Sequence, residues 1–167
     1  MPLVKQGRLA EDAWTTVDDE APLPATGAVI VPLSRWRSEA AVLRKRAGRV
    51  GVRVPNDTDP DALGPDLDGV TLVAVEFPKY TDGRGYSIAR VLRERHAYAG
   101  ELRAVGNVLR DQFLFMHRCG IDAFEVADDR AVAAWQEALE EFSVFYQPAA
   151  DRRVSASRLR QSRKAAE

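Results

Sequence analysis

The chain has 167 residues, of which 46% are hydrophobic and 29% are charged, and its formal net charge is -1. These values are typical of a globular domain with its own core, and they argue against a disordered or membrane-embedded chain. The balanced charge gives no general attraction to nucleic acid or anionic lipid, and the single cysteine excludes an internal disulfide and a cysteine-rich zinc site.

The first residues, Met1–Lys5, lack the apolar core of a signal peptide. No apolar run reaches the roughly 20 residues that span a bilayer. We therefore expect a cytoplasmic protein without membrane or nucleic-acid partners.

Residues 1–27 are the least regular part of the chain. Residues 13–17 combine a tryptophan with β-branched side chains, which is typical of an edge strand, and residues 18–24 form an acidic, proline-containing connector. We expect residues 1–27 to form an arm or hairpin that covers a sheet edge.

Residues 28–147 show a strand pattern followed by a helix pattern five times and predict an α/β domain. Hydrophobic runs predict strands at 28–31, 50–54, 70–76, 101–105 and 121–126. Helical patterns follow at 34–46, 86–97, 108–119 and 130–145, and a short helical piece begins at Thr58 or Asp59. Ser34 and Asn107 are the expected caps of two of these helices.

This alternation predicts a predominantly parallel sheet of about five strands, because parallel neighbours need a crossover and the crossover here is a helix. We expect an open, doubly wound sheet with helices on both faces. A partial β/α barrel is the alternative, since five units are too few to close an eight-stranded barrel. Residues 148–167 are rich in arginine and poor in apolar side chains, and they predict a basic, disordered tail.

In a parallel sheet, the loops that leave the strands lie at the carboxyl edge, where such folds bind ligands. The longest of these loops, residues 77–87, carries cationic side chains between glycines, and the loop after residue 105 opens onto the same edge. Glycines that adopt positive φ, a helix N-terminus and basic side chains suit a small anion. The candidate ligand-binding residues are Lys79, Asp82, Gly83, Arg84, Gly85, Tyr86, Ser87, Arg90, Asn107, Arg110 and Asp111.

A purely structural use of these residues is the alternative: Asp82 pairs with Arg84, Ser87 caps the helix, and Arg110 pairs with a nearby carboxylate. No catalytic residue can be named, because both histidines fall at the opposite helix ends. No metal site is expected. The cofactor is unknown, since the chain contains no nucleotide, flavin or iron–sulfur motif.

The central part of the chain resembles the bacterial family known as domain of unknown function 934. The resemblance covers most of residues 28–126 and rests on residues 54–57, 76–87, 100–106, 108–112 and 118–124. It implies a protein associated with sulfite reduction, described as an oxidoreductase or accessory protein, with sulfite reductase as a partner.

The residues and the resemblance together are consistent with three functions. The first is an accessory protein of assimilatory sulfite reduction that binds an anion or the reductase at the carboxyl edge. The second is an enzyme that uses Lys79, Asp82, Arg84 and Asp111 on a phosphorylated or sulfur-oxyanion substrate. The third is a structural module that forms a homodimer.

Overall fold

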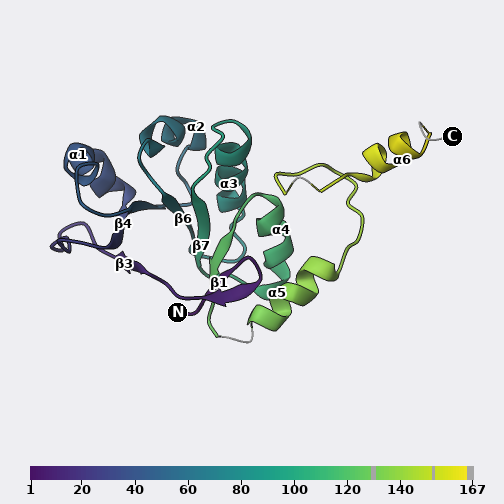
Figure 1. Ribbon diagram of the computed structural model, residues 1–167, viewed down its shortest axis with the longest axis horizontal. Helices are drawn as coiled ribbons and strands as arrows, with labels where there is room; N and C mark the ends of the chain where they lie inside the picture. Colours follow the sequence, from purple (N-terminus) through teal and green to yellow (C-terminus); the bar gives the residue numbers. More distant parts are fainter. Residues whose placement is uncertain (129–130, 152, 165–167) are drawn as a thin grey trace.

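A computed structural model describes residues 1–128, 131–151 and 153–164 (Figure 1). The strands are β1 (Leu3–Lys5), β2 (Arg8–Ala10), β3 (Trp14–Thr16), β4 (Ala28–Pro32), β5 (Val50–Val54), β6 (Leu72–Phe77), β7 (Glu101–Gly106) and β8 (Ala123–Glu125). The α-helices are α1 (Leu33–Leu43), α2 (Pro60–Leu63), α3 (Arg84–Glu94), α4 (Phe113–Arg118), α5 (Ala131–Glu140) and α6 (Ala156–Lys164). Two short 3-10 helices are η1 (Gly64–Leu67) and η2 (Arg110–Gln112).

The strands form one eight-stranded sheet in the order β2-β1-β8-β7-β6-β5-β4-β3. Strands β3 to β8 are consecutive and parallel, whereas β1 pairs antiparallel with both β8 and β2. The predicted parallel α/β arrangement is confirmed, but the sheet has eight strands rather than about five. The additional strands come from residues 3–16.

The consecutive strand order decides where the helices lie. Crossovers between parallel strands are right-handed, so a series of crossovers that all move in one direction places its helices on one face. A doubly wound sheet needs a reversal of this order, and the sheet contains none among β3 to β8. The prediction of helices on both faces is therefore wrong, and the partial barrel is the better description: the sheet curls into a half-barrel with the helices outside (Figure 1).

Alternation along the strands gives the sheet two different faces. The convex face carries buried valines such as Val52 and Val73, which belong to the main core together with Trp36, Leu92 and Trp135 from the helices. Burial of each such large apolar side chain stabilises the fold by about 1.5–3 kcal/mol. The concave face carries the residues between these valines in the sequence, and several of them are charged.

The N-terminal segment joins the two edges of the half-barrel. Strand β2 lies at one edge and β3 at the other, yet only residues 11–13 separate them. An extended chain of this length reaches about 14 Å at most, so the two edges lie within that distance at this end of the sheet. Residues 11–13 therefore run from one edge of the half-barrel to the other.

Several helix ends differ from the prediction. Ser34 lies inside α1, and its hydroxyl donates to Asp19 Oδ1 at 2.6 Å instead of capping the helix. Asn107 caps no helix, because the next helical turn, η2, begins only at Arg110 and is preceded by Leu109. The expected cap at Asp59 is confirmed, since its carboxylate accepts from the Asp61 N–H at 3.0 Å.

Helix α6 extends away from the body of the molecule at the C-terminal end (Figure 1). None of the helices in the described ranges is both long and apolar enough to cross a bilayer.

Candidate functional site

A cavity of about 380 Å³ lies at the carboxyl end of the concave face. All six parallel strands, β3 to β8, contribute residues to it. Alternate residues of each strand point to the concave face, so neighbouring strands bring their side chains to the same cavity. The lining residues are Thr16, Ile30, Arg53, Ala74, Glu76, Phe77, Pro78, Val105, Gly106 and Glu125. This volume falls in the range of small-molecule sites, and the carboxyl end is where β/α barrels bind their ligands.

Arg53 is the cation of this cavity. Its Nε lies 3.2 Å from Glu76 Oε1 on the neighbouring strand, and its Nη2 lies 3.7 Å from Asp18 Oδ1. The Arg53 side chain keeps 34% of its surface exposed. A second hollow, of about 430 Å³, is lined in part by Ser34 and Thr58 and also by Arg53 and Glu76. Arg53 therefore lines two hollows.

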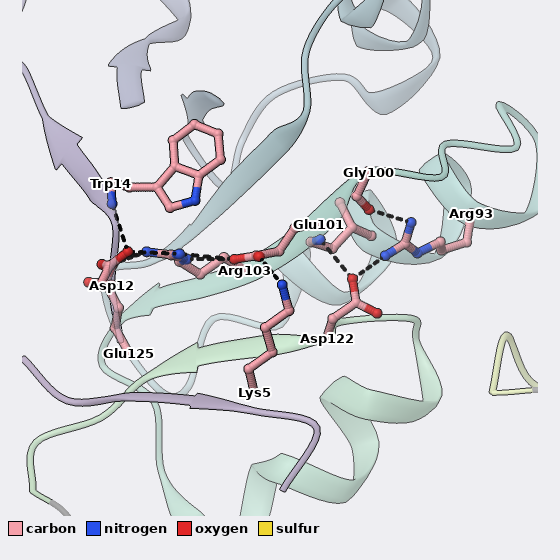
Figure 2. A network of polar contacts seen from close by, with 10 residues as sticks. Lys5, Asp12, Trp14, Arg93, Gly100, Glu101, Arg103, Asp122 and Glu125 are labelled. Atoms are coloured by element: carbon pink, nitrogen blue, oxygen red, sulfur yellow. Dashed lines mark hydrogen bonds and ion pairs between the residues drawn. The ribbon is translucent and has the colours of Figure 1, made fainter. Parts of the chain in front are cut away.

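A buried ionic network lies beneath the cavity (Figure 2). Arg103 of β7 is only 1% exposed, and its Nη1 lies 2.8 Å from Asp12 Oδ2. Its Nη2 lies 3.0 Å from Glu101 Oε1, and its Nη1 also lies 3.4 Å from Glu125 Oε1. Lys5 Nζ approaches the other oxygen of Glu101 at 2.6 Å. One guanidinium thus joins β7, β8 and the segment that bridges the sheet edges.

The network keeps Arg103 charged despite its burial. Burial alone works against the charged form, but the hydrogen bonds and charges of Asp12 and Glu101 outweigh it and raise the pKa of Arg103 above its ordinary value. Removal of Arg103 would leave Asp12, Glu101 and Glu125 without their common partner.

Phe77 and Pro78 at the start of the first predicted loop line the cavity, but the candidate ligand-binding residues 79–87 do not. Arg84 Nη2 lies 2.7 Å from Asp82 Oδ2, and Asp82 also accepts from the Arg84 backbone N–H at 3.3 Å. These hydrogen bonds hold the pKa of Asp82 well below its usual range and raise that of Arg84. Lys79 is exposed beside this pair. The Asp82–Arg84 pairing is the structural alternative that the sequence left open.

The second predicted loop lies beside the first, as the parallel sheet requires. Asn107 N–H donates to Phe77 O at 2.7 Å, and Gln112 Nε2 donates to Tyr80 O at 2.7 Å. Arg110 pairs with Glu137 of α5 at 3.1 Å and is exposed, as is Asp111. The structure brings the two loops together, but neither Arg84 nor Arg110 lines the cavity.

The other predicted residues of the first loop and its helix lie on α3. Tyr86 packs edge-on against Phe77, with ring centroids 5.6 Å apart, and burial raises its pKa to about 12. Arg90 pairs with Glu94 at 3.0 Å, and Ser87 is exposed without capping the helix. Tyr86 and Arg90 line a separate hollow of about 270 Å³ between α3, α4 and residues 147–149.

The expected positive φ at the loop glycines is wrong. Gly83 has φ -83° and precedes α3, and Gly85 lies within the helix. A Cβ at Gly85 would lie 2.7 Å from the Phe77 ring, so this glycine permits close packing of helix on strand. Gly106 has the positive φ instead, at 98°.

The sequence-based prediction placed the site in the loops and did not include the charged strand residues that line and support the cavity. Arg53, Glu76, Arg103 and Glu125 lie within strands, each next to apolar neighbours. A strand of a parallel sheet covered on both faces is almost continuously apolar. Charged residues between such apolar neighbours therefore indicate that one face is free of helices, and this signal was present in the sequence.

Comparison with known proteins gives one match. The model of the family described as "Bacterial protein of unknown function (DUF934)" matches residues 51–156, more than half of the chain. No curated protein and no solved structure matches the chain. The matched range contains Arg53, Glu76, Arg103 and Glu125, whereas Asp12 precedes it.

Proposed function

The chain belongs to the bacterial DUF934 family of unknown function, and from that premise we propose that it binds a small ligand through an anionic group at Arg53. The proposal includes the accessory role in assimilatory sulfite reduction that the family resemblance implied, with the reductase as partner. Its support comes from one observation: the cavity at the carboxyl end of the half-barrel contains a single, accessible guanidinium.

The chemistry of Arg53 fits this role. Arginine presents a planar fork of donors that matches the oxygens of carboxylates, sulfonates and phosphates. Its present partners, Glu76 and Asp18, are themselves carboxylates at 3.2 and 3.7 Å, so an incoming oxyanion replaces groups of its own kind. Because both partners are partly exposed, they can be solvated when they give up the guanidinium.

The first prediction concerns anion binding. Thermal unfolding of the wild type is measured with sulfite, sulfate and phosphate, and a bound ligand at a hundredfold its Kd adds roughly 2.7 kcal/mol to stability. We expect Arg53→Gln to lose this response while it retains the unfolding transition of the free protein, because Arg53 is partly exposed and its pairs contribute little to folding.

Arg84→Gln is the matched control, because Arg84 also belongs to an exposed ion pair at the same edge. We expect this variant to respond like the wild type. If Arg84→Gln loses the response and Arg53→Gln keeps it, the anion binds at the rim loops and the proposal of an Arg53 site is wrong.

A further inference from the structure

We infer that the ligand of this cavity is a zwitterion, with an amine that pairs with Glu125 and an anionic group that pairs with Arg53. The inference rests on the proposed function and extends it by naming the ligand class. Its basis is the distribution of charge around the cavity rather than the presence of Arg53.

The cavity lining has more negative than positive charge. It contains one cation, Arg53, and two carboxylates, Glu76 and Glu125. The network beneath it does not supply the missing positive charge, because Arg103 and Lys5 are already matched by Asp12 and Glu101. A simple anion would enter a site with a surplus of one negative charge. A ligand that also carries an amine removes this conflict.

Glu125 is the carboxylate with the weakest compensation. Glu101 has two cationic partners, at 2.6 Å and 3.0 Å, and Asp12 has Arg103 at 2.8 Å. Glu125 has Arg103 alone, at 3.4 Å, although its side chain is only 23% exposed. In Figure 2 its side chain overlaps that of Asp12 at the left end of the network. A partly buried carboxylate with one distant partner gains most from a cation in the cavity.

The spacing of the two groups defines the shape of the ligand. Arg53 lies on β5 and Glu125 on β8, with β6 and β7 between them. Three strand spacings amount to about 14 Å along the sheet, and the curl of the sheet and the length of both side chains shorten the gap to be filled. The lining between them includes the apolar side chains Ala74 and Val105. This arrangement suits an ω-amino acid or its sulfonate or phosphate analogue, with methylene groups between the charged ends.

The test compares matched compounds by calorimetry and by NMR titration of the full-length chain. The zwitterions are β-alanine, γ-aminobutyrate, δ-aminovalerate and homotaurine; their amine-free partners are propionate, butyrate, valerate and propanesulfonate. We expect the wild type to bind at least one zwitterion about tenfold or more tightly than its partner, since hydrogen bonds to charged groups contribute on this scale.

Two variants locate the amine. Glu125→Gln should abolish the preference for the zwitterion, whereas Glu140→Gln, at an exposed position on α5, should leave it unchanged. Glu76→Gln should strengthen binding of the amine-free anions, because it removes the carboxylate that competes for Arg53.

The outcomes separate this inference from the proposed function. If the wild type binds butyrate as tightly as γ-aminobutyrate and the other pairs behave alike, the ligand is a simple anion: the zwitterion inference is wrong and the Arg53 site stands. If Arg53→Gln has no effect on any compound that binds, both proposals fail. If none of these compounds binds, the zwitterion inference is wrong, and the thermal response to sulfite, sulfate and phosphate decides whether the Arg53 site stands. If Glu125→Gln does not fold, the relative affinities of the wild type for the zwitterions and their amine-free partners still test the inference.

Discussion

His117 is a residue whose environment makes folding depend on pH. It lies at the end of α4 and packs edge-on against Trp135, with ring centroids 5.8 Å apart. Burial lowers its pKa below the ordinary value of 6.5. The folded protein therefore holds this imidazole neutral at a pH where the unfolded chain binds a proton.

This difference predicts a loss of stability in mild acid. Since the unfolded state binds more protons between the two pKa values, the free energy of unfolding falls as pH drops below about 6.5. We expect the free energy of unfolding of His117→Gln to depend less on pH in this range. The lost ring contact lowers its stability by a constant amount at every pH. Denaturant unfolding between pH 7.5 and about pH 5 measures both slopes, and identical slopes would show that His117 is not responsible.

Arg84 and Arg53 show how differently two arginines at one edge are placed. Arg84 finds Asp82 only two positions earlier in the chain, so their pairing is a local property. Arg53 lies beside Glu76 because β5 and β6 are parallel neighbours. It lies near Asp18 because β3, which ends just before Asp18, pairs with β4, the strand next to β5. The first pair could be expected from the sequence; the second depends on strand order.

At the scale of elements, Gly106 fixes the end of β7 against β6. Its φ is 98°, and a Cβ there would lie 2.7 Å from Phe77 O. The same carbonyl accepts the Asn107 N–H at 2.7 Å. The backbones of the two strands therefore approach closely at the edge of the cavity, and only glycine fits both the conformation and the space.

We predict that Gly106→Ala destabilises the protein by about 1–2 kcal/mol or more, from the cost of positive φ in an L-residue and the contact with Phe77 O. Gly83→Ala is the matched control, because its φ is -83° and the nearest side-chain atom to a new Cβ lies 3.8 Å away. Chemical denaturation of both variants provides the measurement. Equal stability of the two would contradict the argument.

At the scale of the whole molecule, Arg103 joins the parts that make the sheet a half-barrel. Asp12 belongs to the segment between the two edge strands, and Glu101 and Glu125 belong to β7 and β8. The curl of the sheet brings these carboxylates around one guanidinium. The concave face therefore combines this ionic network with a small apolar cluster of Ile30, Leu72 and Ala74, whereas the convex face is held by the main apolar core.

Replacement of Arg103 by methionine tests this role. It keeps much of the side-chain volume but leaves Asp12 and Glu125 without their partner and Glu101 with Lys5 alone, so we expect a loss of about 2 kcal/mol or more in the free energy of unfolding. Arg110→Met removes an exposed ion pair and should change stability by less than about 1 kcal/mol. If the two variants prove equally stable, Arg103 does not contribute to the fold in this way.

The sequence by itself determined the local features of this protein. Periodicity located the strands that became β4 to β8 and the helices between them, and it placed an edge strand at residues 13–17. Residues 76–87 carried the family resemblance that the match to residues 51–156 confirms. These features depend on short-range patterns of apolar, capping and turn residues in the sequence, which do not require knowledge of the tertiary contacts.

Only the tertiary structure decided the direction of the crossovers, and with it the cavity. Periodicity does not distinguish a doubly wound sheet from a half-barrel, because both alternate strand and helix. Once β3 to β8 follow one another in a single direction, the helices gather on the convex face and the strand residues between the core valines face a common interior. Arg53, Glu76, Arg103 and Glu125 meet there through strand pairing, across distances in the chain that no local pattern spans.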